Sequence, residues 1–325
     1  MRTIFVTGGA GYIGSHTIKA LEKEGYKTVV YDNLVTGHSQ AVKNAELIIG
    51  DLRDVDKLDK ALKKYKYDGV IHFAGSAYVG ESIQNPSKYY NNNIISGINL
   101  LDCMVRNNIK NIIFSSSCAT YGVPERLPIT ENMKQNPISP YGWTKLVFEQ
   151  MMKDYESAYG LKYVALRYFN AAGADLDGEL FENHDPETHI IPLILQTAMG
   201  VRDEFVVYGN QYETKDGSCI RDYIHVNDLA EAHIKALNYL LEEGISQEIN
   251  LGTGVGLSVF DILQQVEQIT GKKINYRVGA QRPGDPASLI ADNKKAETIL
   301  HWKAEYSNIR TIIQTALKYY NASLE

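Results

Sequence analysis

The chain has 325 residues, 44% of them hydrophobic and 22% charged, and a formal net charge of −6. These proportions are typical of a globular protein, and the acidic balance argues against a nucleic-acid-binding surface. The three cysteines, Cys103, Cys118 and Cys219, are too few and too scattered for a disulfide framework or a thiolate metal site, and they suit a reducing cytoplasm. We find no apolar run of the roughly 18 residues that a membrane helix needs, and no room for a signal peptide before the first strand. We therefore expect a cytoplasmic protein without a membrane or nucleic-acid partner.

The first predicted elements are a buried strand at Ile4–Val6, a glycine-rich stretch at Thr7–Gly14 and a helix at Ser15–Glu24. This order is typical of a dinucleotide-binding turn, in which three glycines permit a tight turn, close approach of a pyrophosphate and close packing of the helix. Those positions are Gly8, Gly11 and Gly14. The helix N-terminus would present free N–H groups and a positive dipole end to the phosphates. The alternative is an incidental glycine turn.

The second predicted strand, Lys27–Tyr31, is followed by Asp32, which lies 18 residues beyond Gly14. A carboxylate at this place in a dinucleotide-binding fold holds the hydroxyls of the adenosine ribose. No arginine occurs between Asp32 and Val42 to bind a 2′-phosphate. The sequence therefore predicts an NAD site in preference to an NADP site.

Strand and helix patterns alternate further along the chain. Apolar runs predict strands at Ala45–Ile49, Gly69–Phe73, Asn111–Ser115 and Tyr163–Arg167, and amphipathic patterns predict helices at Val55–Tyr65, Tyr89–Arg106 and Ser139–Tyr159. This alternation predicts an α/β fold with a doubly wound (Rossmann) parallel sheet, because parallel strands buried on both faces are continuously apolar. Ligands of such sheets bind beyond the carboxyl ends of the strands, so the site is expected there.

Polar and small residues follow three of these strands. Asp51, which precedes Leu52, either accepts a hydrogen bond from an adenine amino group or caps the helix at Val55–Tyr65, and the sequence leaves both readings open. The pair Ala74–Gly75 would let the backbone pass close to a flat cofactor. The run Ser115–Ser117 either closes a turn or, through its last hydroxyl, contacts a substrate.

Tyr141 and Lys145 lie four residues apart, on one face of a predicted helix. The lysine could lower the pKa of the tyrosine by charge and hydrogen bonding, which would make the phenolate usable as a base near neutral pH. The alternative is a surface tyrosine beside a solvated lysine. The position of the pair after Ser117 and behind a dinucleotide-binding fold favours the catalytic interpretation.

Together, the glycine turn, Ser117 and the pair of Tyr141 and Lys145 resemble the extended short-chain dehydrogenase/reductase superfamily. Within it, the chain resembles the UDP-glucose 4-epimerases of the NAD-dependent epimerase/dehydratase family. The segments that carry this closer resemblance are His72–Gly75, Val79–Ser82, Arg167–Asn170, Arg221–Val226 and Arg282–Asp285. The match covers nearly the whole chain.

The resemblance implies an isomerase that interconverts UDP-galactose and UDP-glucose through hydride removal at C4, a 4-keto intermediate and hydride return to the opposite face. The catalytic residues that it implies are Tyr141, Lys145 and Ser117. The implied contacts to a tightly bound NAD, regenerated in each turnover, are Gly8, Gly11, Tyr12, Ile13, Gly14, Asp32, Asn33, Asp51, Leu52, Phe73, Ala74, Gly75, Asn92, Ser115, Tyr141, Lys145 and Tyr168. The implied contacts to the UDP-sugar are Ser117, Tyr141, Asn170, Arg221, Tyr223, Arg282, Asp285 and Leu289.

Arg221 and Arg282 also have a physical reason to bind a diphosphate, because guanidinium groups form bidentate, charge-assisted hydrogen bonds. The alternative for either arginine is a structural ion pair with Asp222 or Asp285. The resemblance adds that Asn170 binds the diphosphate and that Asp285 holds a nucleotide ribose. The spacing of three histidines does not match that of metal ligands: His184, His189 and His301. We therefore expect no metal.

Beyond Gly173 the pattern changes, and helices are predicted at Ile190–Ala198, Asp228–Leu241 and Ser258–Thr270. We expect an NAD-binding domain at residues 1–173, completed by strands and helices from about residues 222–252. Residues 174–325 would mainly form a smaller lobe that binds the sugar nucleotide. The resemblance further implies a homodimer, in which the helices at Tyr89–Arg106 and Tyr141–Tyr159 pair across a two-fold axis.

Three other functions compete with epimerisation: a sugar-nucleotide 4,6-dehydratase, a UDP-glucuronate decarboxylase and a non-catalytic NAD-binding regulator. The two enzymes carry an acid after the fifth strand, whereas Ser117–Tyr121 contains no carboxylate. A regulator usually lacks the tyrosine or the lysine, and both are present. One departure from the epimerases is that Ser76–Tyr78 contains no lysine after Gly75. Either a contact to the nicotinamide ribose is then missing or Lys145 supplies it alone, and we expect NAD to be held less tightly.

Leu289, four residues after Asp285, occupies the position that borders the sugar in related epimerases. A large aromatic residue there excludes an N-acetyl group, and a small residue admits it. A leucine is intermediate in size, and hydrophobic walls discriminate weakly. We therefore expect UDP-glucose and UDP-galactose to be the better substrates, with slower turnover of UDP-N-acetylglucosamine and UDP-N-acetylgalactosamine.

Overall fold

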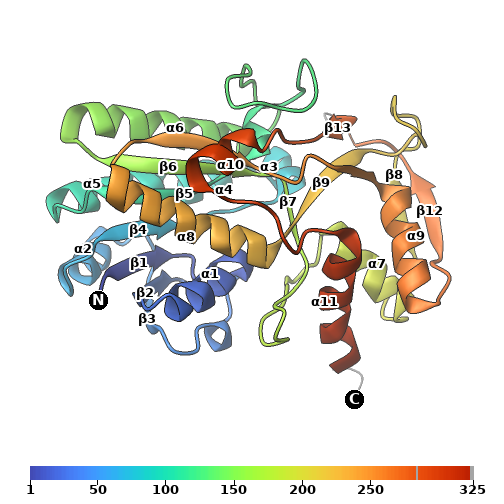
Figure 1. Ribbon diagram of the computed structural model, residues 1–325, viewed down its shortest axis with the longest axis horizontal. Helices are drawn as coiled ribbons and strands as arrows, with labels where there is room; N and C mark the ends of the chain where they lie inside the picture. The colour runs from blue at the N-terminus through green and yellow to red at the C-terminus, as the bar shows by residue number, and fades with distance from the viewer. Residues whose placement is uncertain (283–284, 323–325) are drawn as a thin grey trace.

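A seven-stranded parallel sheet forms the centre of the computed structural model, which describes residues 1–282 and 285–322 (Figure 1). Its strand order is β10-β6-β5-β4-β1-β2-β3. The bounds of these strands are β1 Thr3–Thr7, β2 Lys27–Asp32, β3 Glu46–Ile49, β4 Gly69–His72, β5 Asn111–Ser117, β6 Lys162–Tyr168 and β10 Gln247–Leu251. The predicted doubly wound parallel sheet is confirmed, and the chain returns from its C-terminal half to add β10 beside β6.

Helices cover both faces of this sheet. One face packs against α1 (Tyr12–Lys23), α8 (Val226–Glu243) and α10 (Lys294–Leu300). The other face packs against α2 (Val55–Lys63), α5 (Ser96–Arg106) and α6 (Pro140–Tyr159). Side chains alternate along each strand: in β1, Ile4 and Val6 join the first core and Phe5 joins the second. The strands are continuously apolar because both of their faces are buried.

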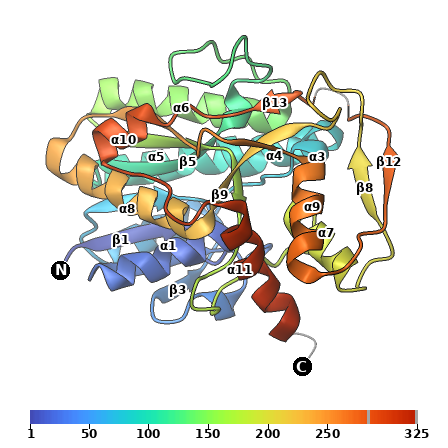
Figure 2. The same ribbon diagram turned by 45° about the vertical axis from the view of Figure 1, so that its right-hand side comes forward.

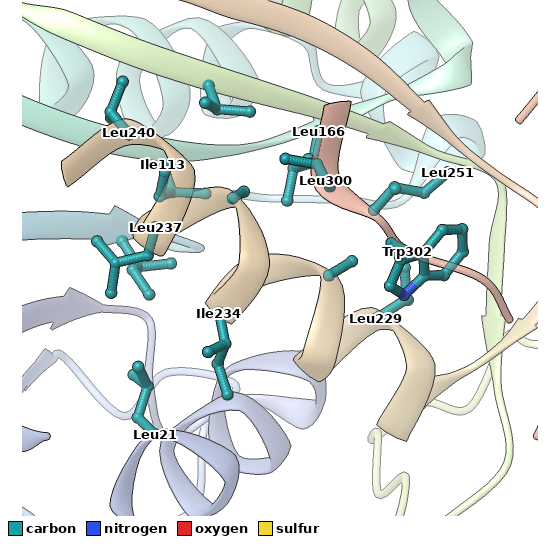
Figure 3. Packing of buried hydrophobic residues seen from close by; sticks show 14 of the residues in the cluster. Leu21, Ile113, Leu166, Leu229, Ile234, Leu237, Leu240, Leu251, Leu300 and Trp302 are labelled. Carbon is teal, nitrogen blue, oxygen red and sulfur yellow. The ribbon is translucent and has the colours of Figure 1, made fainter. Parts of the chain in front are cut away.

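Helix α8 supplies much of the first core, as Figure 3 shows. Its apolar face carries Leu229, Ile234, Leu237 and Leu240, which pack with strand residues such as Leu166. The hydrophobic effect contributes about 25 cal/mol for each Å² of apolar surface that is removed from water. Burial of this face therefore anchors a helix from the second half of the chain on a sheet that is built mostly from the first half.

The first helix begins earlier than the sequence predicts. Helix α1 starts at Tyr12 and not at Ser15, so Gly14 lies within its first turn. A Cβ atom on Gly14 would lie 2.4 Å from the carbonyl oxygen of Gly8, which is closer than non-bonded atoms approach. Glycine costs about 1 kcal/mol in a helix relative to alanine, and the packing of the turn against the helix outweighs that cost here.

The predicted helix at Tyr89–Arg106 is interrupted. Helix α4 (Pro86–Tyr89) passes into a π-helical segment at Tyr90–Ile95 before α5 begins. Within it Asn93 is buried, and its side chain bonds both backbone groups of Ser76 and the Thr144 hydroxyl. π-Helical turns occur frequently at functional sites. The π-helical turn at Tyr90–Ile95 directs the Asn93 side chain to the loop after β4. Helical periodicity in the sequence does not reveal this contact.

A second region lies to the right of the main sheet in Figures 1 and 2. Its four-stranded sheet centres on β9 (Ile220–His225), which pairs with β7 (Asn170–Ala172), β11 (Gly256–Ser258) and β13 (Ser288–Leu289). A separate pair consists of β8 (Phe205–Tyr208) and β12 (Tyr276–Gly279). The other elements there and beside α6 are α7 (Ile190–Ala198), α9 (Val259–Thr270), α11 (Ile309–Ala322) and α3 (Val79–Gln84). Among the described residues, no helix is both long enough and apolar enough to cross a membrane.

A buried ion pair joins the main sheet to helix α6. Arg167 on β6 contacts Glu149 on α6 through two hydrogen bonds of 2.9 and 2.6 Å, and both side chains are almost fully buried. The Ser116 hydroxyl donates to the same carboxylate, and Arg167 also donates to the hydroxyl of Tyr121. Tyr121 in turn donates to Asn250 on β10. The network therefore links β5, β6, β10 and α6 just below the carboxyl edge of the sheet.

We expect the substitution Arg167→Met to lower the free energy of unfolding by about 3–5 kcal/mol, because it leaves the Glu149 carboxylate buried without its charge partner. The double variant Arg167→Met/Glu149→Leu should lose less than Arg167→Met alone, because no unpaired buried charge remains. Chemical denaturation of the three proteins measures both effects. Additive losses would contradict this account of the pair.

Candidate active site

Three predicted catalytic side chains meet at the carboxyl edge of the main sheet. Ser117 ends β5, while Tyr141 and Lys145 lie in the first two turns of α6. The helix begins there because the Ser139 hydroxyl accepts a hydrogen bond from the backbone N–H of Gly142 and Pro140 occupies the first turn. Ser117, Tyr141 and Lys145 are all buried, and the Ser117 and Tyr141 hydroxyls interact.

The lysine acts on the tyrosine differently from the prediction. The Lys145 ammonium donates a hydrogen bond of 2.7 Å to the Ser115 carbonyl, and it lies 5.7 Å from the centre of the Tyr141 ring. Burial raises the pKa of Tyr141, with a further increase from Tyr168 and a partial offset from Ser117. Burial also lowers the pKa of Lys145 to about 8. The predicted lowering of the Tyr141 pKa is therefore wrong for these groups alone, because desolvation by burial dominates and raises it. Positive charge added nearby would favour the phenolate.

The glycine turn leaves room for a ligand at the N-terminus of α1. Gly8 has a φ of +71°, and a Cβ there would lie 2.5 Å from the backbone nitrogen of Ala74. Gly11 differs, since its Cβ would meet only the Gly8 carbonyl oxygen, at an ordinary 3.4 Å. Protein contacts therefore require glycine at the first position but not at Gly11. Open space in front of a helix N-terminus fits a pyrophosphate.

The carboxylates at the end of β2 and just after β3 are already hydrogen-bonded. Asp32 accepts hydrogen bonds from the backbone N–H groups of Ala10 and Leu34. The bond to Ala10 stabilises the glycine turn. Asp51 accepts from the side chains of Arg53 and Asn33, and the arginine lowers its pKa. The reading of Asp51 as a helix cap is wrong, because Asp54 caps α2. A role of Asp51 towards adenine stays a prediction.

The remaining predicted cofactor residues border the same edge of the sheet. Leu52 is buried after β3, and Tyr12 and Ile13 open α1. The Tyr168 hydroxyl bonds the Ser115 side chain at the ends of the adjacent strands β6 and β5. The Phe73 ring packs against His233 in a tilted arrangement, with ring centres 4.7 Å apart.

The loop where the epimerases often carry a lysine is held by asparagines. Asn92 donates to the Ser76 hydroxyl at 3.0 Å, and Asn93 bonds the Ser76 backbone. Gly75 lies against Asn93, because a Cβ there would come within 3.3 Å of its side-chain oxygen. These amides order the backbone after β4 without supplying a positive charge.

A family model for the "NAD dependent epimerase/dehydratase family" matches residues 4–252 of this chain. The chain belongs to this family. A UDP-glucose 4-epimerase from Lacticaseibacillus casei is 49% identical over 319 residues, which cover 98% of this chain and 96% of that protein. The crystal structure of a UDP-glucose 4-epimerase from Brucella ovis in complex with NAD is 53% identical, covers 98% of both chains and superposes with a TM-score of 0.96. A Bifidobacterium longum UDP-glucose 4-epimerase in complex with NAD+ and UDP is 38% identical, covers 99% of both chains and has a TM-score of 0.95.

Strand β9 brings together the predicted sugar-nucleotide residues of this family member. Arg221 and Tyr223 lie on β9, paired with Leu289 on β13 and Asn170 on β7 respectively. A cavity beside this sheet is lined by Asn170, Tyr223 and residues that lead into α7. Segments that are far apart in sequence therefore converge there.

The two arginines differ in their surroundings. Arg221 is buried and forms an ion pair with Asp285, as the alternative reading allowed, while a second nitrogen donates to the Ile220 carbonyl. Asp222 does not serve as that partner, because its carboxylate accepts hydrogen bonds from Thr253, Gly254 and Ala291. Arg282 is exposed, and its guanidinium lies 4.0 Å from the ring centre of Tyr208. Pro283 and Gly284, which complete the predicted motif, lie outside the described residues.

Leu289 is buried in a small apolar cluster. Its neighbours there include Cys118 and Phe169, which directly follow Ser117 and Tyr168 in the sequence. The Leu289 side chain therefore packs against the sequence neighbours of two predicted site residues. Its contact with a sugar stays a prediction.

Sequence reasoning missed a cluster of ionisable side chains on the segment before α7. Glu182, His184, Glu187 and His189 each bring one potential ligand atom within 4.8 Å of the others. Glu182 and His189 also line the cavity that contains Asn170. The repeated Glu-x-His pattern at Glu182–His184 and Glu187–His189 is the signal in the sequence that could have revealed it. Their closeness depends on a fold-back of the loop that spacing rules for helices do not describe.

We expect Tyr141→Phe to lower turnover at least about a hundredfold, because it removes the phenolic proton acceptor and preserves the buried ring. Affinity for the sugar nucleotide should barely change. Tyr89→Phe is the matched control, since the rings of Tyr89 and Tyr141 are 6.5 Å apart and Tyr89 bonds Glu81 and the Tyr78 carbonyl. Steady-state kinetics on all three proteins tests the role. Turnover of Tyr141→Phe within about threefold of wild type would contradict proton transfer by Tyr141.

Proposed function

We propose that the chain is a UDP-glucose 4-epimerase that interconverts UDP-galactose and UDP-glucose. The observation that carries the proposal is the meeting of Ser117, Tyr141 and Lys145 with a dinucleotide-binding turn, in a member of the NAD dependent epimerase/dehydratase family. UDP-glucose 4-epimerases of 41–49% identity span nearly the whole chain, which supports the substrate. The enzyme is an NAD-dependent isomerase.

The residues around the glycine turn would hold NAD. The N-terminus of α1 at Gly11 would hold the pyrophosphate, and Asp32 would accept hydrogen bonds from the ribose hydroxyls. When bound, NAD accepts a hydride from C4 of the sugar and returns it within the same turnover. Lys145, whose ammonium donates to the Ser115 carbonyl near the end of β5, would contact the nicotinamide ribose.

Tyr141 transfers the proton at the sugar O4 hydroxyl. Its phenolate takes the proton from O4 while the hydride leaves C4, so that the C–O bond becomes a carbonyl and a 4-keto sugar forms. Ser117 donates a hydrogen bond to that oxygen and positions it. The raised pKa of Tyr141 means that the phenolate depends on nearby positive charge, which Lys145 and an oxidised nicotinamide supply together.

Inversion requires the sugar to present its other face while UDP stays bound. Arg221, Arg282 and Asn170 hold the diphosphate, and Asp285 holds a ribose hydroxyl. The ion pair between Arg221 and Asp285 aligns both side chains before the nucleotide arrives. These residues all contact the nucleotide part of the substrate. The 4-keto sugar is therefore free to turn and to receive the hydride on the opposite face.

The competing reactions lack their acids. Ser117–Tyr121, directly after β5, contains no carboxylate, and its side chains bond the backbone and the Arg167 network. A 4,6-dehydratase and a decarboxylase are therefore not favoured. A non-catalytic regulator is not favoured either, because Tyr141 and Lys145 are both present and buried together. We further propose a cytoplasmic enzyme in which residues 1–173 with about 222–252 carry NAD and the remaining lobe carries the UDP-sugar.

We expect the purified protein to contain NAD without any addition and to convert UDP-galactose to UDP-glucose with no net formation of NADH. The physical reason is that each hydride removed from C4 returns to the same sugar. The protein is denatured and removed, and the absorbance of the supernatant gives the NAD content. A coupled assay for UDP-glucose gives the turnover. NADH that accumulates in proportion to product would identify a dehydrogenase and overturn the proposal.

We also propose a homodimer through a helix bundle. Large apolar side chains are exposed along α3, the π-helical segment, α5 and α6, an unusual gathering on a single monomer surface. They are Val79, Ile83, Tyr90, Ile95, Ile98, Trp143 and Val147.

We expect a dimer mass by light scattering at micromolar concentration, and a monomer mass for Trp143→Glu, because a buried charge without a partner opposes association. Val201→Glu, at an exposed apolar residue on another part of the chain, is the control and should stay dimeric. A monomer mass for the wild type would contradict the proposal.

Leu289→Tyr should suppress turnover of UDP-N-acetylglucosamine more than that of UDP-glucose, because the larger ring narrows the space beside the sugar. A misfitting group in an apolar wall costs about 1–3 kcal/mol, so the ratio of the two turnover rates should change about 10–200-fold. Leu289→Met, which conserves volume, is the control. The assignment fails if both activities fall in the same proportion or if the wild type does not turn over the N-acetylated sugar.

A further inference from the structure

The side-chain cluster before α7 has the dimensions of a metal site. The Nδ1 atom of His184 lies 3.3 Å from Glu182 Oε1 and 3.7 Å from Glu187 Oε2. The Nδ1 atom of His189 lies 2.7 Å from Glu182 Oε1 and 3.3 Å from Glu187 Oε1. In a tetrahedral zinc site with bonds of about 2.0–2.1 Å, neighbouring ligand atoms are about 3.3 Å apart. The separations that involve Glu182 Oε1 and Glu187 Oε2 lie on both sides of that value, and the four candidate ligand atoms all lie within 4.8 Å of one another. Small side-chain movements would bring them to zinc-binding distances.

The atoms that face the centre of the cluster lack hydrogen bonds. Glu182 Oε1 and the Nδ1 atoms of His184 and His189 are buried and have no hydrogen-bond partner, although they are within ion-pair distance of one another. The directions of the groups therefore do not suit N–H···O bonds, even where the atoms are close. Buried polar atoms without partners cost about 1–3 kcal/mol each. A cation at their centre would satisfy all of them at once.

The second carboxylate is oriented by the backbone. Glu187 Oε1 accepts the backbone N–H groups of Thr188 and His189 at 2.7 and 2.8 Å. This leaves Oε2 of Glu187 directed at His184. Hydrogen bonds of this kind orient the ligands of metal sites. The Glu182 carboxyl is itself 7% exposed, so it is not a solvated surface acid.

We propose that Glu182, His184, Glu187 and His189 form a structural site for a divalent transition-metal ion, of which zinc is the best fit. Two imidazoles with two carboxylates suit Zn²⁺, whereas Mg²⁺ and Ca²⁺ prefer oxygen ligands alone. Four protein ligands leave no open position, which is the pattern of structural and not catalytic zinc.

The site would fasten the segment at residues 182–189 against the rest of the protein. The rings of Tyr12 and Tyr78 lie edge-on to His184, at 6.3 and 6.0 Å between ring centres. Tyr12 begins α1 beside the glycine turn, and its hydroxyl donates to the Gly173 carbonyl. The bound ion therefore joins the wall of the cavity near Asn170 to the N-terminal turn. This role does not depend on the identity of the sugar substrate.

The same four groups can also form an ion-pair network without a metal. Burial acts to lower the pKa values of the two histidines, but the carboxylates outweigh it and raise the pKa of His184 to about 9 and that of His189 to about 10. Protonated histidines would then neutralise both glutamates. The ion pair and the metal site make opposite predictions for zinc binding, so a binding measurement separates them.

The test uses the full chain without a histidine tag. After treatment with a chelator, the protein is titrated with Zn²⁺ in competition with a chromophoric chelator, and metal content is measured by elemental analysis. We expect one equivalent of zinc per chain, a rise in thermal stability on zinc addition and, with Co²⁺ in its place, the intense visible absorption of a tetrahedral site. An absence of stoichiometric binding would overturn the proposal in favour of the ion-pair network.

Matched variants assign the ligands. His184→Gln/His189→Gln should weaken zinc binding at least about a hundredfold and abolish the Co²⁺ spectrum, because glutamine does not place a donor at the Nδ1 position. His301→Asn is the control, since His301 is exposed and its φ of +49° is one that asparagine tolerates. Zinc that binds equally well to the double variant would be adventitious and would overturn the proposal. The wild-type titration and spectrum decide the question even if the double variant does not fold.

Discussion

The buried pair of Arg167 and Glu149 is the interaction on which the geometry of the active site depends. It ties α6 to β6 beneath the strand ends, and Ser116 and Tyr121 extend it to β5 and towards β10. Tyr141 and Lys145 project from the first turns of the same helix. A buried ion pair adds little net stability compared with apolar packing. Its contribution here is to fix the position of α6 relative to the end of β5, where Ser117 lies.

Desolvation then sets the electrostatics of the site. It raises the pKa of Tyr141 and lowers that of Lys145, so both side chains are biased towards their neutral forms. An oxidised nicotinamide would bring the positive charge that a Tyr141 phenolate needs. On this account the base is activated by the assembled complex and not by the lysine alone.

Much of the fold could be predicted because its signals are local. The continuous apolar strands, the glycine turn and the spacing of Tyr141 and Lys145 each lie within a few residues, and the parallel sheet that they predicted is present. The roles of the individual site residues stay predictions that the kinetic experiments test. The direction of the Tyr141 pKa was predicted wrongly, since burial is a property of the whole fold. The π-helical segment at Tyr90–Ile95 was also missed. Its Asn93 side chain forms hydrogen bonds with Ser76 and Thr144, which are distant in sequence.

The sequence by itself determined the α/β class, the family and the chemistry available at the strand ends, because periodicity and short motifs encode them directly. Only the tertiary structure decided which partners the charged groups take. It paired Arg221 with Asp285 and not with the adjacent Asp222, and it gave the cap of α2 to Asp54 and not to Asp51. It also gathered Glu182, His184, Glu187 and His189 into one cluster. Such pairings depend on distances in space and on burial, and a linear spacing of residues specifies neither.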